Sequence, residues 1–62
     1  MINLYEVLSL ISVQNVVIIN YDGSEKSFND YVDAQNELPD SVLNRNVLFI
    51  QALEDEVMFI QL

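Results

Sequence analysis

Residues 47–62 combine two apolar segments with an acidic turn, a pattern that predicts a β-hairpin. Side chains in a strand alternate between its two faces, and here both faces are apolar. A hairpin in a small antiparallel sheet normally shows one polar face to water, so we expect a second copy of the chain or a partner to cover one face. One face collects Leu48, Ile50, Ala52, Met58, Ile60 and Leu62, and the other collects Val47, Phe49, Leu53, Val57 and Phe59.

The length of the chain, 62 residues, predicts one small domain that spans residues 1–62. A chain of this size buries only about 60% of the surface that its unfolded form exposes, and many such domains depend on disulfides, metals or oligomerisation. The sequence has no cysteine and no histidine, yet 52% of its residues are hydrophobic. Disulfides are therefore excluded and the usual soft metal ligands are missing. We expect a homodimer that holds no cofactor.

The net charge of −8 arises from ten acidic residues against Lys26 and Arg45. Phosphate backbones and anionic lipid headgroups repel such a chain, so we expect neither direct nucleic-acid binding nor membrane binding. A basic protein surface is the partner that this charge favours. The sequence shows no signal-peptide pattern and no apolar run long enough to span a membrane, and we expect a cytoplasmic protein.

The N-terminal residues predict an amphipathic helix. Leu4, Val7, Leu8 and Ile11 recur at the spacing of one helix face. Asn3 is a favourable N-cap, and a glutamate three residues later completes the pattern of a capping box.

The next segment predicts a second hairpin. Residues 13–21 are rich in β-branched side chains, which favour a well-covered strand. Asp22 and Gly23 then provide the positive φ angles of a tight turn, so residues 24–28 should form the returning strand.

Residues 29–46 fit either a helix or a loop with one or two helical turns. Ser27 and Asp30 have the spacing of a capping box, which would open a helix with Tyr31 and Ala34 facing inward. Pro39 suits a first helical position. Residues 40–44 then predict a single helical turn that directs three apolar side chains into the core, namely Leu38, Val42 and Leu43.

Together these elements predict an α+β fold, with one N-terminal helix on an antiparallel sheet of about four strands. The order along the chain is helix, two strands, short turn and two strands. An uncovered strand edge exposes unpaired backbone groups, so we expect dimerisation through the C-terminal hairpin or its edge. The residues expected at this interface are Val47, Phe49, Leu53, Val57 and Phe59.

Acidic residues concentrate in two segments, around positions 30–40 and at the tip of the C-terminal hairpin. The spacing of Asp30, Asp33 and Glu37 would align their carboxylates on one helix face. They form either a solvated surface or a contact for a basic partner. The residues of the predicted acidic contact are Asp30, Asp33, Glu37, Asp40, Glu54, Asp55 and Glu56.

The composition argues against catalysis. Nucleophilic serines need a base, and with no histidine in the chain only Lys26 could serve. A carboxylate pair can perform acid/base chemistry, but a chain of this length leaves little room for the concave, dry pocket that such a pair needs. We expect a protein that is not an enzyme.

The last part of the chain resembles the ending of short uncharacterised acidic proteins from phages and mobile elements of Gram-positive bacteria. The likeness rests on Glu37-Leu38-Pro39, the run from Val42 to Val47, and the apolar hairpin with Ile50, Ala52, Glu54-Asp55 and Ile60. The segment 29–36 is longer and more acidic than in those proteins.

Small acidic phage proteins include inhibitors of bacterial immune systems that act by binding. The resemblance therefore implies an anti-defence inhibitor in the host cytosol, with a nucleic-acid-handling host protein as its target. The alternative is a small structural or accessory homo-oligomer whose acidic surface only provides solubility.

Overall fold

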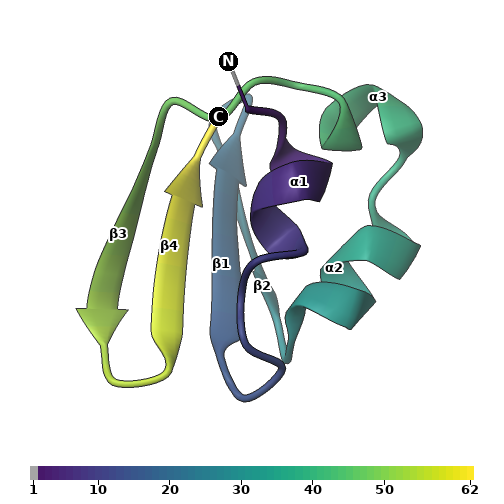
Figure 1. Ribbon diagram of the computed structural model, residues 1–62. Helices are drawn as coiled ribbons and strands as arrows, with labels where there is room; N and C mark the ends of the chain where they lie inside the picture. The colour runs from purple at the N-terminus through teal and green to yellow at the C-terminus, as the bar shows by residue number, and fades with distance from the viewer. Residues whose placement is uncertain (1) are drawn as a thin grey trace.

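The computed structural model describes residues 2–62, which form three short helices and a four-stranded sheet (Figure 1). This arrangement confirms the predicted α+β class and the N-terminal helix. No helix in this part of the chain has the length and apolar character needed to cross a membrane. In chain order the elements are α1 (Leu4–Leu8), β1 (Val16–Tyr21), β2 (Ser24–Phe28), α2 (Tyr31–Glu37), α3 (Asp40–Leu43), β3 (Phe49–Glu54) and β4 (Val57–Gln61).

The sheet has the strand order β2-β1-β4-β3 and is mixed. Both hairpins, β1–β2 and β3–β4, are antiparallel, whereas the central strands β1 and β4 are parallel. The prediction of a fully antiparallel sheet is therefore wrong for the central pair. The long connection through α2 and α3 carries the chain to the far edge of the sheet, where β3 forms, and β4 returns beside β1 in the same direction (Figure 1).

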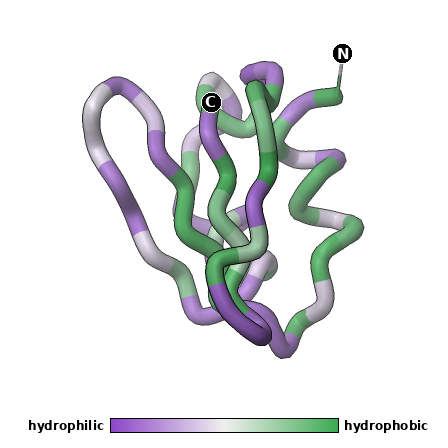
Figure 2. Tube along the Cα trace, turned by 90° about the vertical axis from the view of Figure 1, so that its left-hand side faces the viewer, coloured by the Kyte–Doolittle hydropathy of each residue, from purple (hydrophilic) through white to green (hydrophobic). Residues whose placement is uncertain are grey.

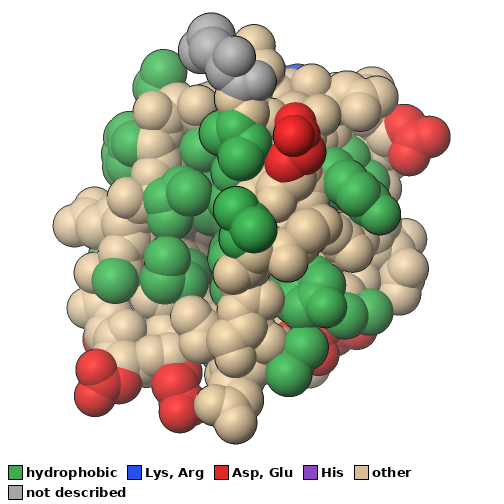
Figure 3. All heavy atoms as spheres, in the orientation of Figure 1, with side chains coloured by type: hydrophobic (Ala, Val, Ile, Leu, Met, Phe, Trp, Pro, Cys, Tyr) green, Lys and Arg blue, Asp and Glu red, His purple; other side chains and the backbone are tan. Residues whose placement is uncertain are grey.

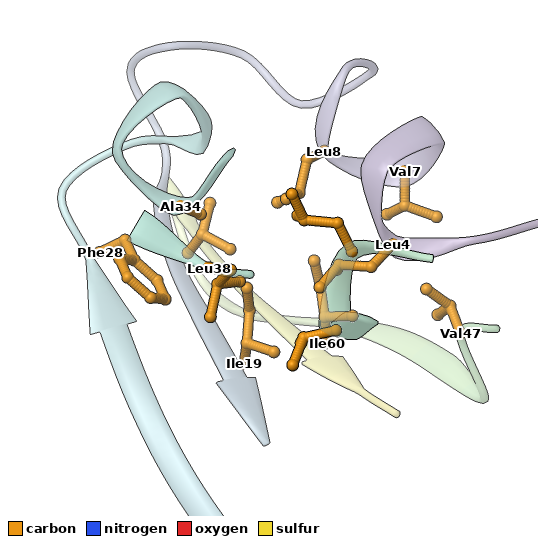
Figure 4. Close-up of a cluster of buried hydrophobic side chains, with 12 residues drawn as sticks. Leu4, Val7, Leu8, Ile19, Phe28, Ala34, Leu38, Val47 and Ile60 are labelled. Atoms are coloured by element: carbon orange, nitrogen blue, oxygen red, sulfur yellow. The ribbon is translucent and has the colours of Figure 1, made fainter. Parts of the chain in front are cut away.

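The core lies between the sheet and the helices (Figure 4). Alternation along β1 turns Val17 and Ile19 toward the helices, where both are fully buried beside Ile60 of β4. Burial of apolar surface is the main favourable term in folding, and these central positions receive most of it. The buried residues are Leu4, Val7, Leu8, Val17, Ile19, Phe28, Ala34, Leu38, Val42, Leu43, Val47 and Ile60.

Helix α1 begins at the predicted capping box. The Glu6 amide donates to Asn3 Oδ1 at 2.9 Å, and the Asn3 amide donates to Glu6 Oε1 at 3.4 Å. The helix ends at Leu8, and the predicted stripe is confirmed because Leu4, Val7 and Leu8 are buried. The last member of the stripe, Ile11, is partly buried against the same core.

The middle segment is helical, which decides between the two alternatives that its sequence allows. Asp30, and not Ser27, caps α2, because Ser27 pairs with Ile18 within the sheet. The Asp30 carboxylate accepts the Asp33 amide hydrogen at 2.9 Å. Helix α2 is joined to α1 by Gln35, whose Nε2 donates to Ser9 Oγ at 3.1 Å. The predicted burial of Leu38, Val42 and Leu43 in the core is confirmed.

Two turn residues give a paired stability prediction. Gly23 has φ 78° with open space around its α-carbon, so Gly23→Ala should cost about 1 kcal/mol from backbone strain alone. Glu56 has φ 64°, and Glu56→Gly should gain several tenths of a kcal/mol because the strain is relieved. Urea unfolding measures both changes. Glu56→Gln is the matched control that removes the charge and keeps the strain, and equal stability of the Gly and Gln variants would contradict the argument.

Candidate interaction surface

One face of the sheet carries apolar side chains that no helix covers within residues 2–62. We call this surface the outer face. Since Val17 and Ile19 point to the helices, their neighbours Val16 and Ile18 point away from them. Register places Phe59 beside Ile18 on the same side. These side chains are half-buried by one another rather than by a second layer. The apolar residues of the outer face are Val16, Ile18, Phe49, Val57 and Phe59.

An aromatic pair links β4 to β3 on the outer face. The rings of Phe49 and Phe59 lie with centroids 6.1 Å apart and planes tilted by 32°, a separation at which aromatic pairs attract each other. Aromatic residues are enriched among the anchors of protein interfaces. The pair therefore forms an apolar centre from which a partner could gain contact area.

A polar pair closes one end of the outer face. Asn20 Nδ2 donates to Gln61 Oε1 at 3.0 Å, and Gln61 Nε2 donates to the backbone carbonyls of Asn20 at 3.3 Å and of Leu62 at 2.9 Å. The amide groups thus have partners within the chain. The apolar area ends where this pair begins, as the polar rim of an interface does.

Strand β3 forms one edge of the sheet, and all six of its residues are exposed. Figure 2 looks onto this edge and shows a largely hydrophobic strand that ends in a hydrophilic turn. Figure 3 shows that hydrophobic side chains over β3 and β4 are also visible from the helix side. The helices lie over β1 and β2 (Figure 1), so neither face of β3 is covered by them.

The backbone of β3 directs hydrogen-bonding groups out of the sheet at two positions. Directly after β4, the Leu62 amide donates to the Asn20 carbonyl of β1, and directly before β4, the Glu56 carbonyl accepts from the Val16 amide. The backbone groups of the even-numbered residues in β4 therefore face β1, and those of the odd-numbered residues face β3. In β3, Phe49 pairs with Gln61 and Gln51 pairs with Phe59, so the backbone groups of Phe49 and Gln51 face β4. The intervening residues Ile50 and Ala52 therefore direct their N–H and C=O groups away from β4.

The acidic turn, which we define as Glu54, Asp55 and Glu56, lies at the end of β3. All three side chains are exposed. A β-bulge precedes the turn, because Ala52 pairs with Met58 while Glu54 pairs with Val57 and leaves Leu53 as the extra residue. The turn thus places three carboxylates at the end of the sheet opposite to the Asn20–Gln61 pair.

The other predicted acidic residues lie elsewhere. Asp30 is the N-cap of α2 and Asp33 lies in its first turn, where negative charge is favourable near a helix N-terminus. Glu37 and Asp40 are exposed on α2 and α3. Helix α2 packs on β1 and β2, whereas the acidic turn belongs to β3 and β4 at the other edge of the sheet (Figure 1). The structure therefore divides the predicted acidic contact into two separate groups.

The predicted dimer contact also needs a correction. Val47, expected on one face with Phe49, is 9% exposed and belongs to the core beside Leu4 (Figure 4). Strand β3 begins only at Phe49, and the Val47 amide donates to the Ile2 carbonyl at 3.0 Å, which holds this segment against the N-terminus. The structure places the remaining predicted residues, Phe49, Leu53, Val57 and Phe59, in the β3–β4 hairpin.

Sequence reasoning missed the contribution of β1 to this surface. The β-branched run was interpreted as a well-covered strand, yet Val16 and Ile18 belong to the outer face. The sequence feature that indicated an exposed face was Asn20, a polar residue that lies on the same face of the strand as Val16 and Ile18. Within residues 2–62 there is no group of three or more metal-ligating side chains and no pocket. The exposed strand and the outer face are therefore the features from which a function can be argued.

Searches with this chain found no matching protein-family model, no matching curated protein and no matching solved structure.

Proposed function

We propose that this protein is a non-enzymatic binding module whose outer face and acidic turn contact a basic surface of another protein. Its target is a nucleic-acid-handling defence protein of a bacterial host, and the module is encoded by a phage or mobile element and acts in the host cytoplasm. The observation that carries the proposal is the apolar outer face, which the helices leave uncovered and which ends at three exposed carboxylates.

The two parts of this surface have different physical roles. Burial of the aromatic pair Phe49 and Phe59 would supply affinity, since interface energy concentrates in a few well-packed anchors. The acidic turn would supply specificity and a faster encounter, because complementary charge steers association. A polar rim around an apolar centre is the usual arrangement of an interface.

The charge of the chain supports the choice of target class. Proteins that handle nucleic acids carry basic surfaces for phosphate groups, and a chain with net charge −8 is attracted to such surfaces. The resemblance of residues 37–60 to small acidic phage proteins supports the same class. An inhibitor of this kind would occupy the surface that otherwise binds nucleic acid.

The proposal is tested with two charge-matched variants and host extract. The turn variant combines Glu54→Gln, Asp55→Asn and Glu56→Gln, and the helix variant combines Asp33→Asn, Glu37→Gln and Asp40→Asn. A host protein captured by the immobilised wild type is purified, and its affinity for each variant is measured by calorimetry at several salt concentrations. We expect the turn variant to bind at least about tenfold more weakly and the helix variant to bind like wild type, with wild-type affinity falling as salt rises.

A third variant tests the apolar part of the surface. Val57→Thr preserves shape and introduces a hydroxyl group on the outer face, and it should weaken binding without changing the salt dependence. Loss of binding in the helix variant alone would overturn the proposed surface and move the contact to α2 and α3. Absence of any salt-sensitive partner would instead support the accessory role, in which the charge serves solubility only.

A further inference from the structure

The two edges of the sheet differ in how they are protected. Edge strands expose backbone groups that can pair with another chain, and charged side chains usually block such pairing. Strand β2 at one edge carries Glu25 and Lys26. Strand β3 at the other edge has no charged residue before Glu54, and Ile50 is 44% exposed. The β3 edge therefore lacks the charged side chains that protect β2, and its bulge at Leu53 lies beyond Ile50 and Ala52.

We propose that two copies of the chain pair through β3 in antiparallel orientation, with a two-fold axis at Gln51. In this register Ile50 faces Ala52 of the partner subunit, and the two residues exchange both backbone hydrogen bonds. Ile50 and Ala52 are the residues whose N–H and C=O groups point out of the sheet. The two-fold axis repeats the exchange, so the outward groups of both copies are satisfied without any change inside either sheet.

The side chains are also complementary in this register. On the helix side, the large Ile50 lies opposite the small Ala52 of the partner subunit. Phe49 of the outer face lies opposite Leu53 of the partner subunit, and the two Gln51 amides meet at the axis. Cross-strand pairs of aromatic and aliphatic residues stabilise adjacent strands, and this contact would cover side chains that are exposed in the single chain.

The charge distribution permits self-association in spite of the net charge of −8. Antiparallel pairing places each acidic turn at the opposite end of the contact, so the two turns do not face each other. Each turn instead lies toward the end of the partner where β3 begins. The paired segment itself, residues 49–53, is uncharged.

The dimer would join the two sheets into one and place the two outer faces side by side. This inference goes beyond the proposed function, because it concerns the purified chain alone and needs no target. The two surfaces share Phe49 but differ in their other residues, since Ile50 and Ala52 belong to the dimer contact whereas Phe59 and the acidic turn belong to target binding.

The mass in solution, measured by light scattering behind size exclusion, tests the dimer. We expect wild type to have twice the monomer mass of 7.1 kDa and to dissociate on dilution. Ile50→Lys should be monomeric, because it places a charge in the contact. Val32→Lys is the matched control, since it makes the same change at a residue of α2 that is 41% exposed, and it should remain dimeric. A dimeric Ile50→Lys, or a wild type that is monomeric at every concentration, overturns the proposal.

Hydrogen exchange on the wild type identifies the contact without relying on a variant that has to fold. The Ala52 amide should exchange at least about tenfold more slowly in concentrated than in dilute protein, because the partner subunit's Ile50 carbonyl accepts its hydrogen. A dimer whose Ala52 amide exchanges equally fast at both concentrations uses another surface, which overturns the β3 pairing. Raising the salt concentration should tighten the dimer by screening the repulsion between two acidic chains, whereas it should weaken target binding.

Discussion

Leu8→Ala is expected to remove about 2–5 kcal/mol from the free energy of unfolding. Leu8 is fully buried between α1 and the sheet, so truncation leaves a cavity in the core. A chain of 62 residues has a total stability of only about 3–9 kcal/mol. The variant should therefore unfold at much lower urea than wild type, and at the upper end of this range it should be largely unfolded in buffer. Far-ultraviolet circular dichroism during urea titration measures the change.

Leu10→Ala is the matched control for this prediction. Leu10 is two positions further along the chain and 80% exposed, so the same truncation removes little buried surface. Its effect should stay within about 0.5 kcal/mol. All variants are compared at one protein concentration, because the stability of a self-associating chain depends on concentration. Similar losses in both variants would contradict the placement of α1 on the sheet.

Ala34→Leu is expected to cost about 1–3 kcal/mol by overpacking the core. Ala34 is fully buried where α2 packs on β1 and β2, close to Phe28 and Leu38 (Figure 4). A larger side chain has to displace these neighbours or move the helix away from the sheet. Thermal unfolding followed by circular dichroism measures the loss as a lower midpoint.

The exposed side of the same helix provides the control for Ala34→Leu. Asn36→Leu introduces the same side chain at an exposed position of α2, where leucine also has the higher helix propensity. The variant should be as stable as wild type or slightly more stable. If Ala34→Leu were equally well tolerated, α2 could not be packed on β1 and β2 as closely as the structure describes.

The local elements of this fold could be predicted because short-range physics determines them. The helix stripe with its capping box at Asn3, the positive φ angles at Asp22 and Gly23, and the hairpin around residues 54–56 each depend on residues within a few positions. The alternation of side chains that places Ile50 and Ile60 on the same face of the hairpin follows from strand geometry alone. These predictions are confirmed by the dihedral angles, the cap hydrogen bonds and the strand register.

The predictions that failed depend on contacts between distant segments. Whether β4 lies parallel or antiparallel to β1 depends on which edge β3 occupies, and no local pattern encodes that choice. Val47 is in the core because the N-terminal segment holds it there, through the hydrogen bond to Ile2. The predicted acidic contact was divided for the same reason. The spacing of acidic residues along the chain does not determine the distance between α2 and the β3–β4 turn, and these two elements lie toward different edges of the sheet.

For the candidate surface, the amino-acid order alone established that the C-terminal hairpin has two apolar faces and an acidic tip. Only tertiary packing decided which face is covered, because the helices lie over β1 and β2, with Ile60 of β4 buried in the same core, and leave β3 exposed on both sides. Alternation along a strand is a local property of the backbone. Coverage of a face depends on where other elements can pack, and in this chain the short helices do not extend to the last strand of the sheet.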